Sequence, residues 1–285
     1  MDALIEPFTS NPELRNALAA GLLTVIATSV VGTWVVLRGM SFIGDAIAHG
    51  VIPGIALAVL WGFNPLVGAA VAVVVMVGGI GAVGRRSRLS SDTSIGLLFV
   101  GMLALGVVIA SINGSEAEAL TDILFGDALG VTGGDILAIG VTALVVLAVT
   151  VVAYRPLLVL SFSEPKAAAL GFRPALAHGA MLLLVGLTIV VSFTTVGTLM
   201  VFAFLVAPPA AASLVVRRVP AMMAVGVGFG MLAVYVGLLG SHHLVTPPSA
   251  SIAVVAVAQF FVVLVAKELV TARGARLART AVVAP

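Results

Sequence analysis

Long, uninterrupted apolar runs constrain this sequence more than any other feature. A helix that crosses a bilayer needs about 20 mostly apolar residues, and the chain contains about nine such runs. Because the runs are continuous rather than alternating, they favour helices over the strands of a membrane barrel. The sequence therefore predicts an all-α, polytopic transmembrane bundle, with runs at 14–37, 43–61, 65–84, 94–112, 135–153, 176–193, 195–216, 221–240 and 251–268.

The composition agrees with this prediction and excludes several classes of protein. Charged residues make up only 9% of the chain, against roughly 25% in soluble domains. With 61% hydrophobic residues and a mean hydropathy of +1.26, a soluble domain of this size could not bury its apolar surface. These values exclude a water-soluble enzyme, a nucleic-acid-binding protein and a disordered chain.

The runs leave little sequence for a second domain. We expect a single transmembrane domain over 1–285, with a membrane core at 14–268 and a cytoplasmic tail at 269–285. The weakest boundary separates the runs at 176–193 and 195–216. If these two runs formed a single span, the chain would have eight spans instead of nine. No P-loop or other nucleotide signature occurs, so an ATPase that drives the protein would be a separate chain.

The basic residues alternate between the connections in a way that predicts orientation. If the N-terminus lies outside, all but one of the 14 Lys and Arg residues fall in inner segments, and only Arg15 stays outside. Inner loops carry this excess in membrane proteins. We therefore expect a multi-pass plasma-membrane protein with a cytoplasmic C-terminus; its inner cations are Arg38, Arg85, Arg86, Arg88, Arg155, Lys166, Arg173, Arg217, Arg218, Lys267, Arg273, Arg276 and Arg279.

Most of the 12 acidic residues fall on the opposite, outer side. A cluster of acidic residues on the outer surface would concentrate cations near the protein. Acidic residues are also simply tolerated on that side of the membrane, so both interpretations stay open. The outer acids are Asp2, Glu6, Glu13, Glu116, Glu118, Asp122, Asp127 and Asp135.

Ionisable side chains within a span are costly and therefore point to function. Asp45 and His49 are four residues apart, which places a carboxylate and an imidazole on one helix face. Both bind divalent ions such as Zn²⁺, Mn²⁺ and Fe²⁺, although a second copy or other spans would have to complete the site. Asp45 could instead cap a helix near the inner surface. The third such residue, His178, is predicted to be a satisfied interfacial histidine.

A helix break is expected directly after this pair. Gly50 and Gly54 form a GxxxG face for close packing, and Pro53 removes one backbone donor and can kink the helix. Broken helices of this kind bind ions in membrane transporters. A second candidate for metal contact is His242 with His243 in an outer loop, where a solvated turn is an equally simple interpretation.

The inner loop at 162–171 predicts a short helix. Glu164-Pro165 can begin a helix, and Leu170-Gly171 can end it. Such a helix, lying along the membrane, would suit docking into a groove of a partner protein, although an interfacial helix without a partner is also possible. The residues concerned are Phe162, Glu164, Pro165, Lys166, Ala167, Ala168, Leu170 and Gly171.

Taken together, these segments resemble the membrane permease of ABC-type importers of manganese, zinc or iron chelates. The most specific piece is RGMSFIGDAIAHGVIPGIALA at 38–58, and SDTSIG at 91–96, the loop at 162–171 and VGTLM at 196–200 follow in the same order. The resemblance covers nearly the whole chain. It implies that Asp45 and His49 are the ligands of the transported ion.

The resemblance also implies the partners. Two permease copies would surround a central path, cytoplasmic ABC ATPase subunits would dock with 162–171 as the coupling helix, and an extracytoplasmic solute-binding protein would deliver the metal. No cofactor would be bound permanently: Mn²⁺, Zn²⁺ or Fe²⁺ would be cargo, and ATP would be hydrolysed by the partner. The chain itself would therefore not be an enzyme.

The last outer loop departs from the family pattern SYYLDTPSGATI. This chain has Val245 in place of the aspartate, Pro248 in place of the serine and Ser249 in place of the glycine. His242 and His243 stand where aromatic residues are usual. We hypothesise that the two histidines compensate for the missing carboxylate and favour metals that prefer nitrogen ligands, such as zinc.

The sequence thus predicts the permease of an ATP-driven importer of divalent metals that works by alternating access. An ABC permease for a larger ligand, such as a siderophore or cobalamin, is one alternative. A stand-alone ion-gradient transporter or channel is another. An intramembrane enzyme has no support, because no span contains a catalytic signature such as HExxH or GxSxG.

Overall fold

The computed structural model describes residues 2–40, 42–86, 91–113 and 130–283, and within these ranges it contains helices and no strands. Eight helical segments are long and apolar enough to cross a membrane. The predicted all-α, multi-span bundle is therefore confirmed. The helices are α1 (Asp2–Ser10), α2 (Pro12–Leu37), α3 (Phe42–Gly50), α4 (Ile52–Trp61), α5 (Pro65–Arg86), α6 (Ser91–Asn113), α8 (Gly133–Val152), α9 (Tyr154–Phe162), α10 (Glu164–Ala169), α11 (Pro174–Val196), α12 (Thr198–Val215), α13 (Val219–Leu244) and α14 (Pro248–Val283).

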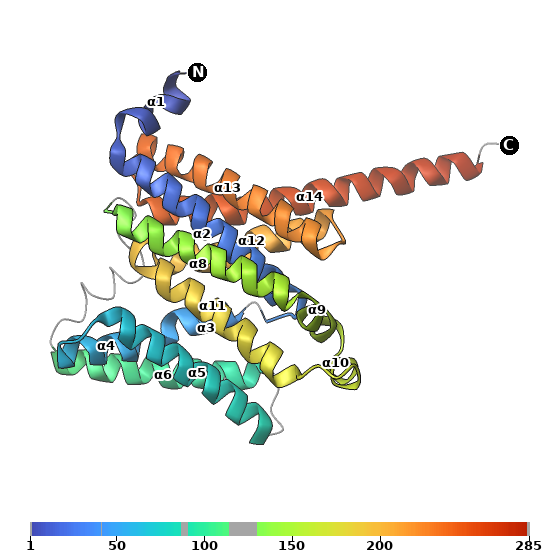
Figure 1. Cartoon of the computed structure of the whole chain (residues 1–285). Coiled ribbons are helices and arrows are strands. Elements are labelled where there is room, and N and C mark those ends of the chain that lie inside the picture. Colours follow the sequence, from blue (N-terminus) through green and yellow to red (C-terminus); the bar gives the residue numbers. More distant parts are fainter. Residues whose placement is uncertain (1, 41, 87–90, 114–129, 284–285) are drawn as a thin grey trace.

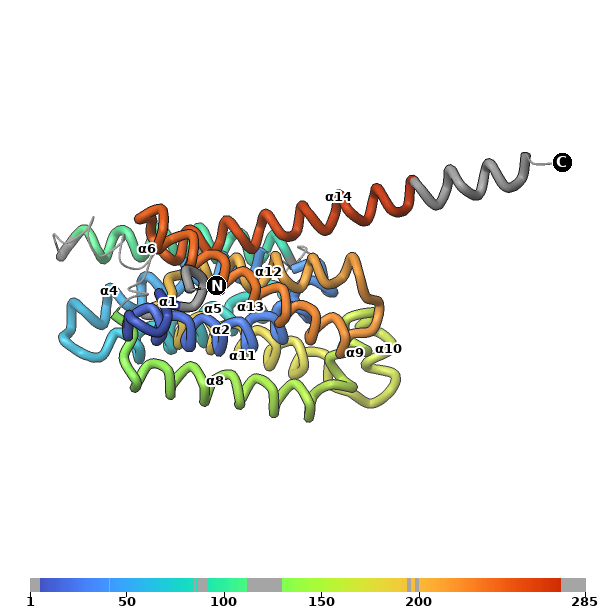
Figure 2. Tube along the Cα trace, turned by 90° about the horizontal axis from the view of Figure 1, so that it is seen from above, coloured from blue at the N-terminus to red at the C-terminus, as the bar shows by residue number. Residues whose placement is uncertain are grey.

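The bundle is organised around α2 (Figure 1). Helices α12, α13 and α14 lie on one side, α3 to α6 lie on the other, and α2, α8 and α11 run between them. Figures 1 and 2 agree that α1 and α4 lie at one end of the bundle, whereas α9, α10 and the far part of α14 lie at the other. Among the described residues, these outer and inner segments of the prediction thus lie at opposite ends.

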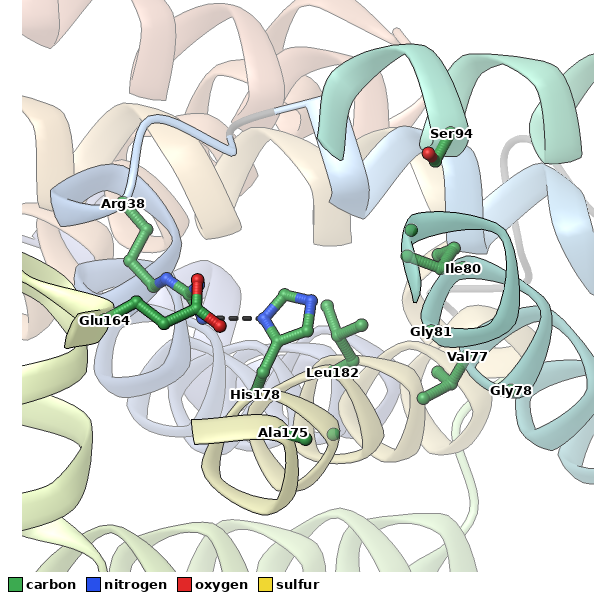
Figure 3. A pocket seen from close by; sticks show the side chains of 12 residues that line it. Arg38, Val77, Gly78, Ile80, Gly81, Ser94, Glu164, Ala175, His178 and Leu182 are labelled. Carbon is green, nitrogen blue, oxygen red and sulfur yellow. Dashed lines mark hydrogen bonds between the residues drawn. The ribbon is translucent and has the colours of Figure 1, made fainter. Parts of the chain in front are cut away.

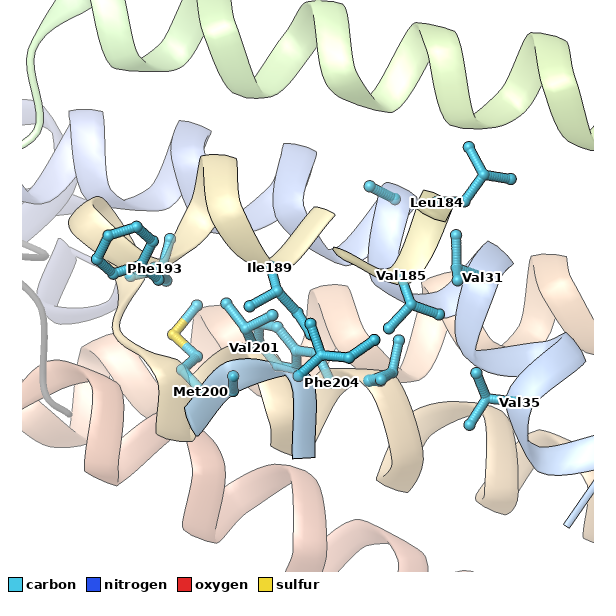
Figure 4. Packing of buried hydrophobic residues seen from close by; sticks show 14 of the residues in the cluster. Val31, Val35, Leu184, Val185, Ile189, Phe193, Met200, Val201 and Phe204 are labelled. Atoms are coloured by element: carbon cyan, nitrogen blue, oxygen red, sulfur yellow. The ribbon is translucent and has the colours of Figure 1, made fainter. Parts of the chain in front are cut away.

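Apolar side chains from α2, α11 and α12 form the centre of the core (Figure 4). Val31, Val185 and Phe204 are completely or almost completely buried there. Many large apolar side chains on the outer helices remain exposed, as expected where lipid replaces water as the surrounding medium. The fold is therefore held by tight packing around α2 and presents apolar surface to its surroundings.

The two breaks in the apolar runs lie near the predicted positions. The run at 43–61 is divided into α3 and α4, with Pro53 in the first turn of α4, where a missing N–H costs nothing. The run at 176–216 is divided at Gly197, whose φ of 77° and ψ of 153° suit glycine. Helix α12 is the shorter, ninth apolar helix, so the predicted division of this run is confirmed.

Helices α4 and α5 cross at a pair of glycines. A Cβ atom on Gly54 would overlap the Gly68 carbonyl oxygen, and a Cβ on Gly68 would overlap the Gly54 carbonyl oxygen. The absence of both side chains lets the two backbones touch. Gly50 is also crowded, but there the neighbour is the flexible end of Met76.

We expect Gly54→Val to destabilise the bundle, because the α4 and α5 backbones would have to separate. Overpacking of this kind costs about 1–3 kcal/mol, which would appear as a lower midpoint of thermal unfolding in detergent. Gly101→Val on α6 is the matched control, since a Cβ at Gly101 meets no atom within 4 Å. Equal losses of stability in the two variants would contradict this account of the crossing.

Candidate metal-binding site

Asp45 and His49 lie on the open face of α3. Their side chains are 29% and 25% exposed, and His49 Nε2 lies 3.4 Å from Asp45 Oδ1. The other residues from Ile43 to Gly50 are buried. The four-residue spacing therefore does what the sequence predicted: it places a carboxylate and an imidazole side by side, one turn apart.

An aromatic pair lies beside the imidazole, and the sequence analysis did not identify it. The ring centroid of Phe99 on α6 is 5.9 Å from that of His49 and 5.5 Å from that of Phe42, which it meets edge to face. Aromatic pairs in such geometries attract one another. Phe99 thus limits the positions that the His49 ring can take, although 50 residues separate the two in sequence and no motif links them.

One chain supplies only part of a metal site. Among the residues that the structure describes, no group of three or more His, Cys, Asp or Glu side chains could hold a metal ion. Asp45 and His49 offer two ligand groups, and their side chains are half-open on the surface of the chain. A metal ion bound by this pair would need further ligands from other polar groups, from water or from another protein.

His242 and His243 lie in the last turn of α13, apart from the α3 pair. Their ring centroids are 5.5 Å apart, and with Glu6, Pro7 and Ser10 they line a pocket of about 300 Å³. The histidine pair is thus joined by a carboxylate from α1 that the sequence did not associate with it. The next residue, Val245, ends the helix with a φ of 52°.

The structure describes only some of the acidic residues that were predicted to lie on the outer side. Asp135 forms a capping box with Thr132 at the start of α8, with Thr132 Oγ1 donating to Asp135 Oδ2 at 2.6 Å. That carboxylate therefore has a structural role in the helix. Glu116, Glu118, Asp122 and Asp127 lie outside the described residues, as do the side chains of Asp2 and several of the cations that were used to predict orientation.

The short helix predicted in the loop at 162–171 is α10. Ser163 Oγ accepts a hydrogen bond from the Lys166 backbone N–H, and Gly171, with a φ of 81°, follows the end of the helix. Pro165, Lys166 and Ala168 are exposed, whereas Ala167 is buried against the bundle. A second short helix, α9, precedes α10 and was not predicted.

Arg38 lies behind α10 in a cavity of about 380 Å³ (Figure 3). Arg38 Nη1 lies 2.6 Å from His178 Nδ1, so His178 has a partner, as the sequence predicted. Glu164 of α10 lines the same cavity. Burial lowers the pKa of the Arg38 guanidinium from its usual value, and the charge of Glu164 acts in the opposite direction.

A comparison with protein-family models shows to which family the chain belongs. The family model described as the ABC 3 transport family matches residues 10–267. The chain belongs to the ABC 3 transport family. The resemblance inferred from the motifs is thereby confirmed, and the matched region includes α3, α10 and the cavity with Arg38.

Individual relatives of the ABC 3 family agree with this assignment. The chain is 34% identical over 249 residues to the "Manganese transport system membrane protein MntC" of Listeria monocytogenes, covering 87% of this chain and 89% of that protein. It is 32% identical to the "Probable iron transport system membrane protein" of Haemophilus influenzae, covering 93% and 97%. Among solved structures, "PsaBC from Streptococcus pneumoniae in complex with Fab" matches with a TM-score of 0.80 and 30% identity, covering 91% of this chain and 94% of that one.

We expect Phe99→Leu to free the His49 imidazole. Loss of an aromatic contact worth about 0.5–1.5 kcal/mol should raise the accessible population of the ring about two- to tenfold. Diethylpyrocarbonate modification followed by mass spectrometry would measure this as faster labelling of His49. His242 and His243 provide the internal control, because their labelling should not change; an unchanged rate at His49 would show that Phe99 does not restrain it.

Proposed function

We propose that this chain is the permease subunit of an ATP-driven importer of divalent transition metals, with Mn²⁺ as the first candidate for cargo. The observation that carries the proposal is the Asp45–His49 pair on the open face of a broken helix, in a chain of this family. The relatives named for manganese and iron transport support the same class of cargo.

The chemistry of the pair suits an ion that must bind and then leave. Carboxylate and imidazole groups accept Mn²⁺, Fe²⁺ and Zn²⁺ alike. Two ligands from one chain bind weakly, which favours release after each cycle. Because Asp45 and His49 face outward from the described chain, a second permease copy could supply the remaining ligands across a shared path.

The proposed partners follow from the two ends of the bundle. The exposed face of α10 would dock in a cytoplasmic ATPase subunit, and the end with α1 and His242 would receive an extracytoplasmic binding protein. This orientation keeps the N-terminus outside, as the distribution of Lys and Arg predicts. ATP binding and hydrolysis in the partner would switch the helices between outward- and inward-facing states, while the permease itself would catalyse no reaction.

We expect Asp45→Asn and His49→Gln each to lower metal uptake at least about tenfold. A loss of about tenfold already follows when a residue that only hydrogen-bonds to a metal ligand is replaced, so loss of the ligand itself should cost at least as much. Both changes keep the approximate size of the side chain but weaken or remove the ligand. Uptake of radioactive Mn²⁺, Fe²⁺ and Zn²⁺ would be compared in proteoliposomes that contain the permease with its ATPase and binding protein.

Asp92→Asn is the matched control, since Asp92 is an exposed carboxylate in the first turn of α6. Loss of one metal only, with normal assembly, would identify the cargo. Unchanged uptake in both variants would make the pair structural and favour a permease for a larger ligand. Uptake by the permease without its ATPase would favour a stand-alone transporter.

The histidine pair is proposed to contact metal at the outer end, with Glu6 as the carboxylate that lines the same pocket. We expect His242→Ala/His243→Ala to reduce Zn²⁺ uptake more than Mn²⁺ uptake, because zinc gains more from nitrogen ligands. Equal effects on all metals would contradict that proposal.

The orientation of the chain can be tested separately. Since the chain contains no cysteine, a His243→Cys variant carries a single thiol, and in whole cells a membrane-impermeant thiol reagent should label it from outside.

A further inference from the structure

The described part of the connection between α2 and α3, residues 38–40, is short and held by backbone hydrogen bonds. The backbone N–H groups of Arg38, Gly39 and Met40 donate to carbonyls of α2, and the Met40 carbonyl accepts from Ile43 N at 2.9 Å. Gly39 has a φ of 66°, which allows the tight turn. These bonds tie residues 38–40 to the end of α2 and, through Ile43, to the first turn of the helix that carries Asp45 and His49.

The Arg38 side chain is held by a residue 140 positions away. Its Nη1 lies 2.6 Å from His178 Nδ1 in the second turn of α11. A guanidinium has donors only, so Nδ1 accepts and the imidazole proton is on Nε2. A ring nitrogen used in this way is not free to bind a metal ion, and the neighbouring positive charge would repel one. The cluster is therefore not a second metal site.

Glu164 brings α10 into the same cluster. Its carboxylate lines the cavity together with Arg38 and His178, and Figure 3 shows the three side chains directed toward one another from the end of α2, from α10 and from α11. Glu164 is the first residue of α10, on the same side as the buried Ala167, which is three positions further along. Ala167 thus packs against the bundle, whereas Glu164, like Pro165 and Lys166, is exposed and lines the cavity from the surface.

On the α5 side the cavity is lined partly by glycines. Gly78, Gly81 and Gly84 carry no side chain there, and a Cβ atom at Gly78 or Gly84 would meet no atom within 4 Å. The cavity of about 380 Å³ thus leaves open space beside the Arg38 and His178 side chains. A charged cluster beside open space, joining three helices, has the properties of a joint rather than of a rigid core contact.

From this arrangement we propose that Arg38, His178 and Glu164 form a joint that passes movement of α10 to α3, and so couples the ATPase to the Asp45–His49 pair. The proposal rests on the function proposed above. In it, the three residues are positioning residues: none touches the metal. When the ATPase moves α10, Glu164 shifts relative to Arg38, and the tight turn at 38–40 transmits the shift to α3.

The test measures metal transported per ATP hydrolysed by the whole complex in proteoliposomes, for Arg38→Gln, His178→Ala and Glu164→Gln. We expect each variant to lower this ratio about fivefold or more, the usual range of coupling between sites, while ATP hydrolysis, assembly and equilibrium metal binding stay near wild type. The double variant Arg38→Gln/Glu164→Gln should be no worse than Arg38→Gln, because residues of one cluster are not additive.

Glu268→Gln on α14 is the matched control, since it removes an exposed carboxylate that does not line the cavity. Arg38 and His178 lie outside α10, so the assembly measurement separates their effects from a loss of docking of α10 to the ATPase. A ratio equal to that of Glu268→Gln in all three variants, or additive losses in the double variant, would overturn the joint. Absence of ATP-driven uptake by the wild-type complex would overturn the proposed function itself, and the joint with it.

Discussion

The bilayer requires every backbone amide and carbonyl of a spanning segment to find a partner inside the protein, and the architecture of this chain follows from that requirement. Helices meet it within each segment. Small residues then let the helices approach until backbones touch, as at the Gly54–Gly68 crossing of α4 and α5. Packing of this kind replaces the hydrophobic effect as the main source of cohesion, because apolar side chains in a bilayer gain little by exchanging lipid for one another.

Against that background, the break between α3 and α4 is costly and therefore informative. It divides an apolar run directly after the one acidic residue and the one histidine of α3. The cost is limited because Pro53 has no N–H to satisfy and Ile55 N still donates to the Val51 carbonyl at 3.1 Å. The break leaves α3 as a short helix, separate from α4, whose two ionisable side chains are Asp45 and His49.

Local patterns allowed much of this to be predicted from the sequence. Run length predicted the spans, proline and glycine predicted the breaks and α10, and a four-residue spacing predicted that Asp45 and His49 meet. Contacts between distant segments could not be predicted. The Arg38–His178 bond, the position of Phe99 beside His49 and the approach of Glu6 to His242 depend on how helices pack, and no periodicity in one sequence encodes those pairings.

The position of Arg38 also affects whether its positive charge competes with a metal ion for Asp45. Arg38 begins the turn that leads into α3, so a permanent positive charge lies close in sequence to the proposed metal ligands. A guanidinium directed toward Asp45 would compete with the metal for the carboxylate. The bond to His178 and the charge of Glu164 direct it instead into the cavity beside α5 and α11. In the proposed mechanism the cluster would therefore have two consequences: it would join α10 to α3, and it would leave the Asp45 carboxylate available for a divalent ion.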